Sequence, residues 1–166
     1  FIDSPFEAAL ERVKGVPLPS SKIIGSGNTY IIGASYNDGF RAVNRLWDQK
    51  ANIRRAQSAF QTSSSGKEHR FPAGTWIIQG VGKPFIESTA SELGLTVYSV
   101  ADLPNVQSIK VRKPRIGVYQ PWSSNMDEGW TRWLLEHFEF DYTTLHPQDL
   151  RAAGSASSKS LGQEKS

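Results

Sequence analysis

The chain has 166 residues, enough for about one domain of average size, and too few for a large multidomain enzyme. Apolar residues make up 38% of it and aromatic residues 11%, so we expect a packed core. The net charge is only +3, the mean hydropathy is -0.42, and no apolar run approaches the roughly 20 residues of a membrane helix. The absence of cysteine excludes a disulfide framework, a thiolate metal site and a cysteine nucleophile, and leaves the cellular compartment undetermined.

The first 19 residues predict a helix followed by a connector. Ser4 and Pro5 are typical of a helix start, and Gly15 is typical of a helix end. Apolar residues between them recur on one helical face, and the Pro-rich residues 16–21 cannot continue the helix. This start has no signal-peptide pattern, so export of the protein would depend on a signal outside these residues.

Strands and helices are predicted to alternate through residues 20–103. Strands are expected at 29–32, between 51 and 60, at 75–78 and at 95–100, and residues 62–67 are expected to form a surface loop. Helices are expected after Asn37 and Asp38, which can cap, and from Pro84 to Gly94. This alternation predicts a layered α/β fold with a mostly parallel sheet.

Residues 104–113 resemble a linker, and residues 114–151 begin a second α/β unit. A strand is expected at 115–119, a helix capped by Asn125, and another strand at 142–145. The helix carries an apolar stripe of Trp130, Trp133, Leu134 and Phe138, and Arg132 is placed to pair with Glu128 and Glu136. Residues 152–166 are expected to be a disordered tail, so this second, Rossmann-like unit is predicted to be incomplete.

Two runs of residues resemble a known family. They are Lys113-Pro114-Arg115-Ile116-Gly117-Val118-Tyr119-Gln120-Pro121-Trp122 and Met126-Asp127-Glu128-Gly129-Trp130-Thr131-Arg132-Trp133-Leu134-Leu135-Glu136. Both resemble a segment of large bacterial zinc carboxypeptidase-family proteins, downstream of the peptidase, where a class I glutamine amidotransferase-like domain begins. Residues 37–46 and 71–75 also resemble the inter-domain region of those proteins. The resemblance implies that residues 20–150 are an internal piece of a longer protein.

The resemblance also implies which residues to look for. Zinc carboxypeptidases bind zinc with a His-x-x-Glu pair and a distant histidine, but none of His69, His137 and His146 has a glutamate three residues later. We therefore assign no catalytic residue, no metal ligand and no cofactor to this chain; zinc is implied only for the parent peptidase domain. The implied partners are the peptidase and the rest of the amidotransferase-like portion.

The loop from Gln120 to Glu128 is the best candidate for a ligand site. It lies between a strand and a helix, where α/β sheets bind ligands; there Trp122 can stack on a ligand and Ser123, Ser124 and Asn125 can donate hydrogen bonds. The alternative is that Asn125 only caps the helix while Trp122 and Trp130 pack in the core or against a further domain. We favour this alternative.

Other patterns are explained by ordinary surface chemistry. Lys110, Arg112, Lys113 and Arg115 form a basic cluster, but no nucleic-acid-binding motif accompanies it. Glycine turns near residues 25–33 do not complete a phosphate-binding motif, and adjacent acids 127 and 128 suit a helix N-terminus better than acid–base catalysis. His69 and His146 are expected to face solvent. Exposed tryptophans and open strand edges would favour self-association.

Two hypotheses about function follow. The first is a non-catalytic accessory region of a zinc carboxypeptidase-like protein, whose parent hydrolyses C-terminal peptide bonds. The second is a free-standing α/β module that binds a small molecule or a protein through residues 120–128. Amidotransferase catalysis is disfavoured, because it needs an activated cysteine and the chain has none.

Overall fold

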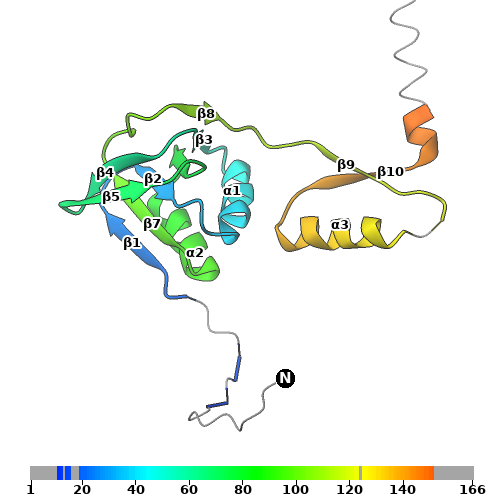
Figure 1. Ribbon diagram of the computed structural model, residues 1–166, viewed down its shortest axis with the longest axis horizontal. Coiled ribbons are helices and arrows are strands. Elements are labelled where there is room, and N and C mark those ends of the chain that lie inside the picture. Colours follow the sequence, from blue (N-terminus) through cyan, green and yellow to red (C-terminus); the bar gives the residue numbers. More distant parts are fainter. Residues whose placement is uncertain (1–10, 13, 16–18, 124, 152–166) are drawn as a thin grey trace, which may run out of the picture.

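The structure is a computed structural model, and it describes residues 11–12, 14–15, 19–123 and 125–151. Two units are joined by an extended segment between β8 and β9 (Figure 1). The second unit contains β9 (Ile116–Tyr119), α3 (Met126–His137) and β10 (Tyr142–Leu145). The first unit contains the other elements: β1 (Lys22–Gly25), β2 (Thr29–Ile32), α1 (Asp38–Asp48), β3 (Asn52–Ala56), β4 (Phe60–Ser64), β5 (Lys67–Phe71), β6 (Trp76–Gln79), α2 (Lys83–Leu93), β7 (Thr96–Val100) and β8 (Ser108–Lys110).

The main sheet is mostly antiparallel, so the prediction of a mostly parallel, Rossmann-like sheet is wrong. Its six strands are ordered β1-β7-β2-β6-β3-β8. Only β1 and β7 pair in parallel; β7 with β2, β2 with β6, β6 with β3, and β3 with β8 are all antiparallel. The fold is mixed α/β.

The sheet is mostly antiparallel because two strand–helix–strand segments each have a strand of the other between their own two strands. Strands β2 and β3, joined by α1, run in the same direction, but β6 lies between them and is antiparallel to both. In the same way β6 and β7, joined by α2, have β2 between them. Helical crossovers therefore do connect parallel-oriented strands, as expected for such connections. Periodicity cannot reveal that each crossover skips one position in the sheet.

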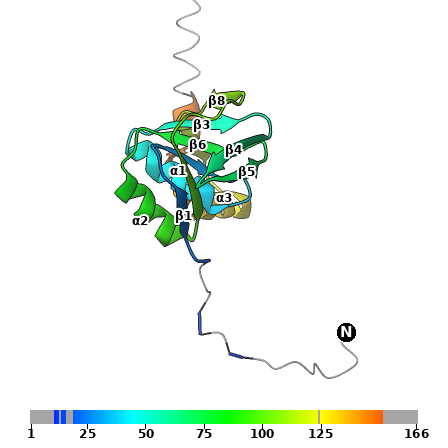
Figure 2. The ribbon, with the colours of Figure 1, turned by 90° about the vertical axis from the view of Figure 1, so that its left-hand side faces the viewer.

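The sheet separates two apolar clusters, because successive side chains of a strand point to opposite faces. Tyr30, Ile32 and Ile78 pack with α1 and α2 on one face, and Ile31 and Ile77 pack on the other. Figure 2 shows α2 and the β4–β5 hairpin on opposite sides of this sheet. All five of these side chains are at most 2% exposed, so the first unit has a packed apolar cluster on each face of its sheet.

Residues 62–67 are not a surface loop but part of the β4–β5 hairpin. Strands β4 and β5 pair from Phe60 with Phe71 to Ser64 with Lys67. Both phenylalanines are buried and their rings stack at 5.2 Å, while the Ser64 hydroxyl donates to the Ile24 carbonyl at 2.8 Å. A polar sequence hid this hairpin, since Phe60 and Phe71 are the only large apolar side chains on the face that packs against the sheet.

Most of the remaining predicted strands and helices of the first unit are present, and two strands were missed. The strands at 29–32, 75–78 and 95–100 and the helix ending at Gly94, which adopts a left-handed conformation with φ of 64°, are confirmed to within one or two residues. Asn37 precedes α1, but its side chain makes no capping hydrogen bond. Strand β1 was not predicted, and the expected linker at 104–113 contains β8, which pairs with β3. The tail at 152–166 and most of the N-terminal helix lie outside the described residues; the described Glu11 and Arg12 are not helical.

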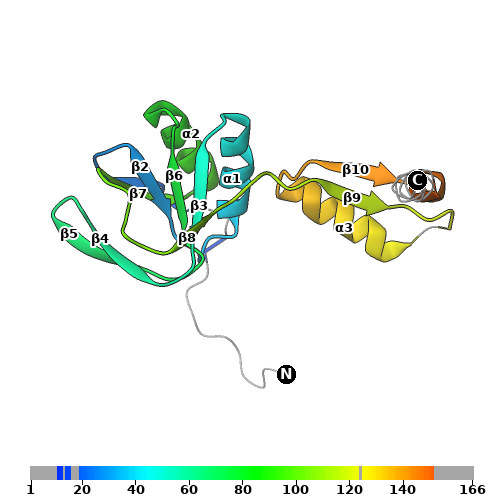
Figure 3. The same ribbon diagram turned by 90° about the horizontal axis from the view of Figure 1, so that it is seen from above.

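The second unit is a small parallel strand–helix–strand motif. β9 and β10 pair in parallel from Ile116 with Tyr142 to Tyr119 with Leu145, and α3 connects them. Viewed from above, the unit lies beyond α1, away from the β4–β5 hairpin (Figure 3). Among the described residues its sheet has two strands, which α3 connects, and residues 147–151 after β10 are also helical.

Candidate functional site

The predicted ligand loop connects β9 to α3. Trp122 is 82% exposed and Ser123 is also exposed, while Ser124 lies outside the described residues. Asn125 caps α3, because its side-chain oxygen accepts a hydrogen bond from the backbone N–H of Asp127 at 2.9 Å. The capping interpretation of Asn125 is therefore confirmed. The expectation that Trp122 and Trp130 pack in a core is not met in the described part of the chain, because both are largely exposed.

A depression of about 290 Å³ lies beside this loop. Trp122, Ser123 and Asn125 line it together with residues Gln120, Pro121 and Glu128. The structure thus brings together three of the four predicted residues. Its volume is at the lower end of small-molecule sites, which run from about 300 Å³ upward.

Helix α3 turns its apolar face away from its own sheet. Met126, Trp130, Trp133 and Leu134 are 50–78% exposed, and with His137 they recur at the spacing of one helical face. We call these five residues the outer stripe. Trp130, Trp133 and Leu134 of the predicted apolar stripe lie on this exposed face, whereas Phe138 is half-buried at the end of α3.

The inward side of α3 is polar instead. Arg132 and Glu128 form the predicted ion pair, with side chains only 21% and 15% exposed. The Arg132 guanidinium also donates to Thr144 Oγ1 at 2.8 Å, which ties the helix to β10. The second predicted pair is replaced, because Glu136 accepts a hydrogen bond from the Tyr142 hydroxyl at 2.5 Å. Polar side chains therefore make most of the contacts between α3 and its sheet, with Leu135 beside β9, while both tryptophans of α3 lie on the opposite side.

A charged cluster joins the second unit to the first. The Glu139 carboxylate accepts hydrogen bonds from Arg41 Nη2 at 2.9 Å and from Arg45 Nε at 2.7 Å. Arg45 also donates to the exposed Glu92 at 2.8 Å. Glu139 follows α3 with a φ of 58°, an uncommon value for a residue other than glycine. We call the contacts of Glu139 with Arg41 and Arg45 the Glu139 clamp.

Electrostatics within the clamp favour the ionised carboxylate. The hydrogen bond from Arg45 is the largest cause that lowers the pKa of Glu139 below its ordinary value; Arg41 acts in the same direction, and burial opposes both. The same pair raises the pKa of Arg45. The clamp is therefore fully charged at neutral pH.

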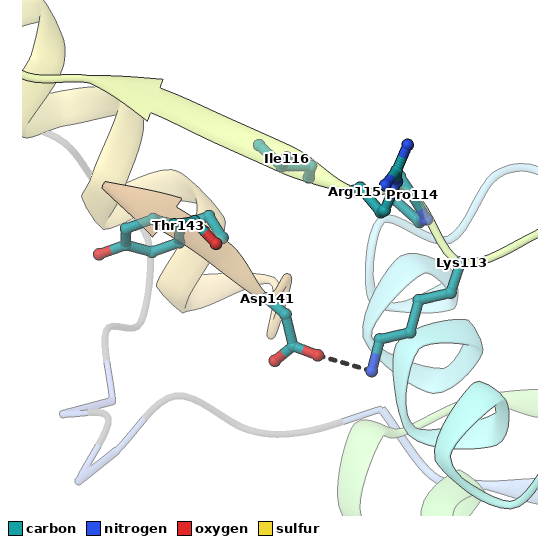
Figure 4. Close-up of a pocket in the computed structure, with 7 residues that line it drawn as sticks. Lys113, Pro114, Arg115, Ile116, Asp141 and Thr143 are labelled. Carbon is teal, nitrogen blue, oxygen red and sulfur yellow. Dashed lines mark ion pairs between the residues drawn. The ribbon is translucent and has the colours of Figure 1, made fainter. Parts of the chain in front are cut away.

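Two further contacts support the junction. The Asn44 side-chain amide, which is buried, donates to the Phe138 carbonyl at 2.7 Å. Lys113 Nζ lies 2.6 Å from Asp141 Oδ2, the ion pair drawn in Figure 4. It also lies 2.7 Å from Asp48 Oδ1, so it bridges the two units. The hydrogen bond to Asp141 is the main cause that raises the pKa of Lys113. Lys113 also lines a depression of about 410 Å³ that the figure shows.

Sequence reasoning missed this junction. The signal that pointed to it was a pair of arginines, Arg41 and Arg45, one helical turn apart on the outward face of a predicted helix. Like charges at this spacing repel, so a carboxylate from another element is a reasonable expectation. Nothing in the sequence around Glu139 identifies it as that carboxylate.

The histidines lie apart from one another. His69, expected to face solvent, instead lies on β5 with its ring 4.6 Å from that of Tyr98, and its Nε2 is buried without a partner among the described residues. His137 stacks on Trp133 at 5.1 Å. His146 is half-buried, and its backbone N–H donates to Asp149. Within the described residues, no cluster of three or more histidine, aspartate or glutamate side chains has a metal-binding arrangement.

The chain was compared with known proteins. No protein-family model, no curated protein and no solved structure matches it. No described helix has the length and apolar character needed to cross a bilayer. The resemblance to zinc carboxypeptidase-family proteins therefore stays a prediction based on the quoted residues.

Proposed function

We propose that this chain is a non-catalytic accessory region of a zinc carboxypeptidase-like protein, which connects the peptidase to an amidotransferase-like portion. The resemblance of residues 113–122 and 126–136 to that family carries the proposal, and the Glu139 clamp supports it. A connecting region has to hold its neighbours in a defined orientation, and Glu139 binds two arginines of α1 across the junction. The contacts of Asn44 and Lys113 reinforce that orientation.

The sequence supports the same proposal. The residues that resemble the family, 113–122 and 126–136, form the end of the connecting segment, β9 and α3. In this proposal zinc belongs to the parent peptidase, where it would supply an activated water for hydrolysis of a C-terminal peptide bond. In this proposal the described residues orient the neighbouring domains and do not take part in catalysis.

The proposal predicts that the native gene product is much larger than this chain. Peptide mapping of the native protein by mass spectrometry should place peptides from residues 115–151 in a polypeptide well above 18.4 kDa that also contains a His-x-x-Glu segment. The purified 166-residue chain should neither retain stoichiometric zinc after dialysis nor hydrolyse peptides. A native product of 18.4 kDa, or zinc-dependent hydrolysis by the purified chain, would contradict the proposal.

The exposure of Trp122 favours one alternative function, a small-molecule-binding module. An indole that is 82% exposed beside a depression of about 290 Å³ is available for stacking on a planar ligand. In this alternative the chain binds its ligand without any neighbouring domain.

The alternative predicts that Trp122→Ala abolishes saturable binding of a planar compound found by screening, because stacking on the indole is lost. Calorimetry of the wild type and the variant would measure the effect, with circular dichroism to verify an unchanged fold. Trp133→Ala is the matched control, since Trp133 is exposed on α3 but does not line the depression. Equal losses in both variants, or no ligand at all, would eliminate this alternative.

A further inference from the structure

The outer stripe of α3 is a large apolar surface without a cover among the described residues. A surface helix normally turns its apolar side to the core and its charged side to water. In α3 the arrangement is reversed, since Glu128 and Arg132 face the sheet while Trp130 and Trp133 are 62% and 54% exposed. The two indoles contact each other edge to face at 6.0 Å, so they form one continuous patch. Such a patch is typical of an interaction surface.

The size of the stripe reaches the minimum for a specific protein interface. From their exposed fractions, the four large side chains of the stripe present on the order of 500 Å² of apolar surface per chain. If two such surfaces cover each other, the area removed from water is about 1,000 Å² before any flanking residue is counted, which is the lower bound for a specific interface. Tryptophans near the centre of such a contact are typical energetic anchors.

The chemistry of the molecule favours a second copy of the stripe as its cover. The other large apolar side chains exposed among the described residues are dispersed over separate loops, strands and the helical residues 147–151: Leu103, Ile109, Tyr119, Trp122 and Leu150. Only the stripe itself offers a matching apolar surface of its size in this part of the chain. Residues 114–151 contain six acids and three bases, so anionic lipid and nucleic acid are disfavoured.

We propose that two copies of this chain dimerise by packing their α3 helices antiparallel along the outer stripes. The contact is isologous, so each residue pair occurs twice. Trp130 of one copy lies against Trp133 of the second copy at the centre. At each end, Asp127 in the first turn of one helix approaches His137 in the last turn of the other, and the antiparallel helix dipoles are favourably opposed.

The groove at the end of α3 fits this arrangement. Leu134, Leu135 and Phe138 line a depression of about 380 Å³ together with Phe40, Phe140 and Asn37. An antiparallel crossing brings Met126 of the second copy to this end of the helix. Methionine is unbranched and fills irregular apolar gaps well, so it is suited to this groove. The proposal does not depend on the zinc carboxypeptidase resemblance, so either can fail without the other.

Sedimentation equilibrium of the 166-residue chain tests the proposal. We expect a reversible monomer–dimer equilibrium with a dimer of twice 18.4 kDa. Trp130→Glu and Trp133→Glu should each weaken dimerisation at least a hundredfold, because a charge would be buried at the centre of the contact. Leu103→Glu is the matched control: it introduces the same charge at an exposed apolar residue off the stripe, and should leave the dissociation constant within twofold of the wild type.

The salt dependence of the dissociation constant distinguishes a second copy of the chain from a charged partner of another kind. Two copies of one chain carry net charge of the same sign, so the dimer should tighten as salt is raised, whereas attachment of an oppositely charged partner would weaken. A chain that stays monomeric at hundreds of micromolar, or a dimer unaffected by both tryptophan variants, would overturn the proposal. Open-ended oligomers would overturn it as well, since an isologous contact closes at two copies.

Discussion

Replacement of Glu139 by glutamine is expected to release the second unit from the first. Arg41 and Arg45 would lose the carboxylate that holds them together, and about 1–3 kcal/mol of stabilisation of the junction should be lost with these charged hydrogen bonds. The exposed segment between β8 and β9 contains Arg112 and Arg115, so trypsin should cut it several-fold faster in the variant. The rate of limited proteolysis measures this effect directly.

The stability that the Glu139 clamp contributes should depend on pH. The pKa of Glu139 is lowered mainly by its hydrogen bond from Arg45, so the clamp contributes its full stability above the ordinary glutamate pKa of about 4.3. That contribution is lost as the pH falls through the lower pKa of the folded state. The difference between wild type and Glu139→Gln should therefore persist down to about pH 5 and vanish in stronger acid. Because trypsin is inactive in acid, this difference is measured there by thermal unfolding of the wild type and the variant.

Glu92→Gln is the matched control for this prediction. It removes the same kind of carboxylate from the same Arg45, but Glu92 is more than half exposed and belongs to the first unit. An exposed pair of this kind contributes little to stability. If Glu92→Gln accelerates cleavage as much as Glu139→Gln does, the clamp is not what holds the junction.

The largest loss of stability is expected from Phe71→Ala in the β4–β5 hairpin. Phe71 is 4% exposed, stacks on Phe60 at 5.2 Å and contacts Tyr98 edge to face at 5.0 Å. Truncation of a buried phenylalanine leaves a cavity and costs about 3–5 kcal/mol. Urea denaturation, followed by circular dichroism, would measure the decrease in unfolding free energy.

Arg70→Ala provides the comparison for that variant. Arg70 precedes Phe71 on the same strand but is exposed, so its truncation should change the unfolding free energy by no more than about 0.5 kcal/mol. Similar effects of the two substitutions would show that the hairpin does not pack on the sheet.

The candidate sites differ in how far sequence alone could locate them. The sequence predicts the loop from Gln120 to Glu128 as a candidate ligand site because a strand is followed by a capped helix, and this local pattern is visible in the sequence. In the Glu139 clamp, Glu139 is separated along the chain from Arg45 by 94 positions and from Arg41 by 98 positions. No local pattern encodes such a contact, because it depends on how the two units meet.

The fold shows the same division. The sequence by itself determined most strand and helix positions, because side-chain periodicity and capping residues act over a few neighbours, as at Gly94 and Asn125. Only the tertiary structure decided the strand order, since β6 pairs between β2 and β3 through contacts made far along the chain. It also decided which way α3 faces. The amphipathic pattern defines an apolar stripe, but the polar anchors Arg132 and Thr144 turn that stripe outward.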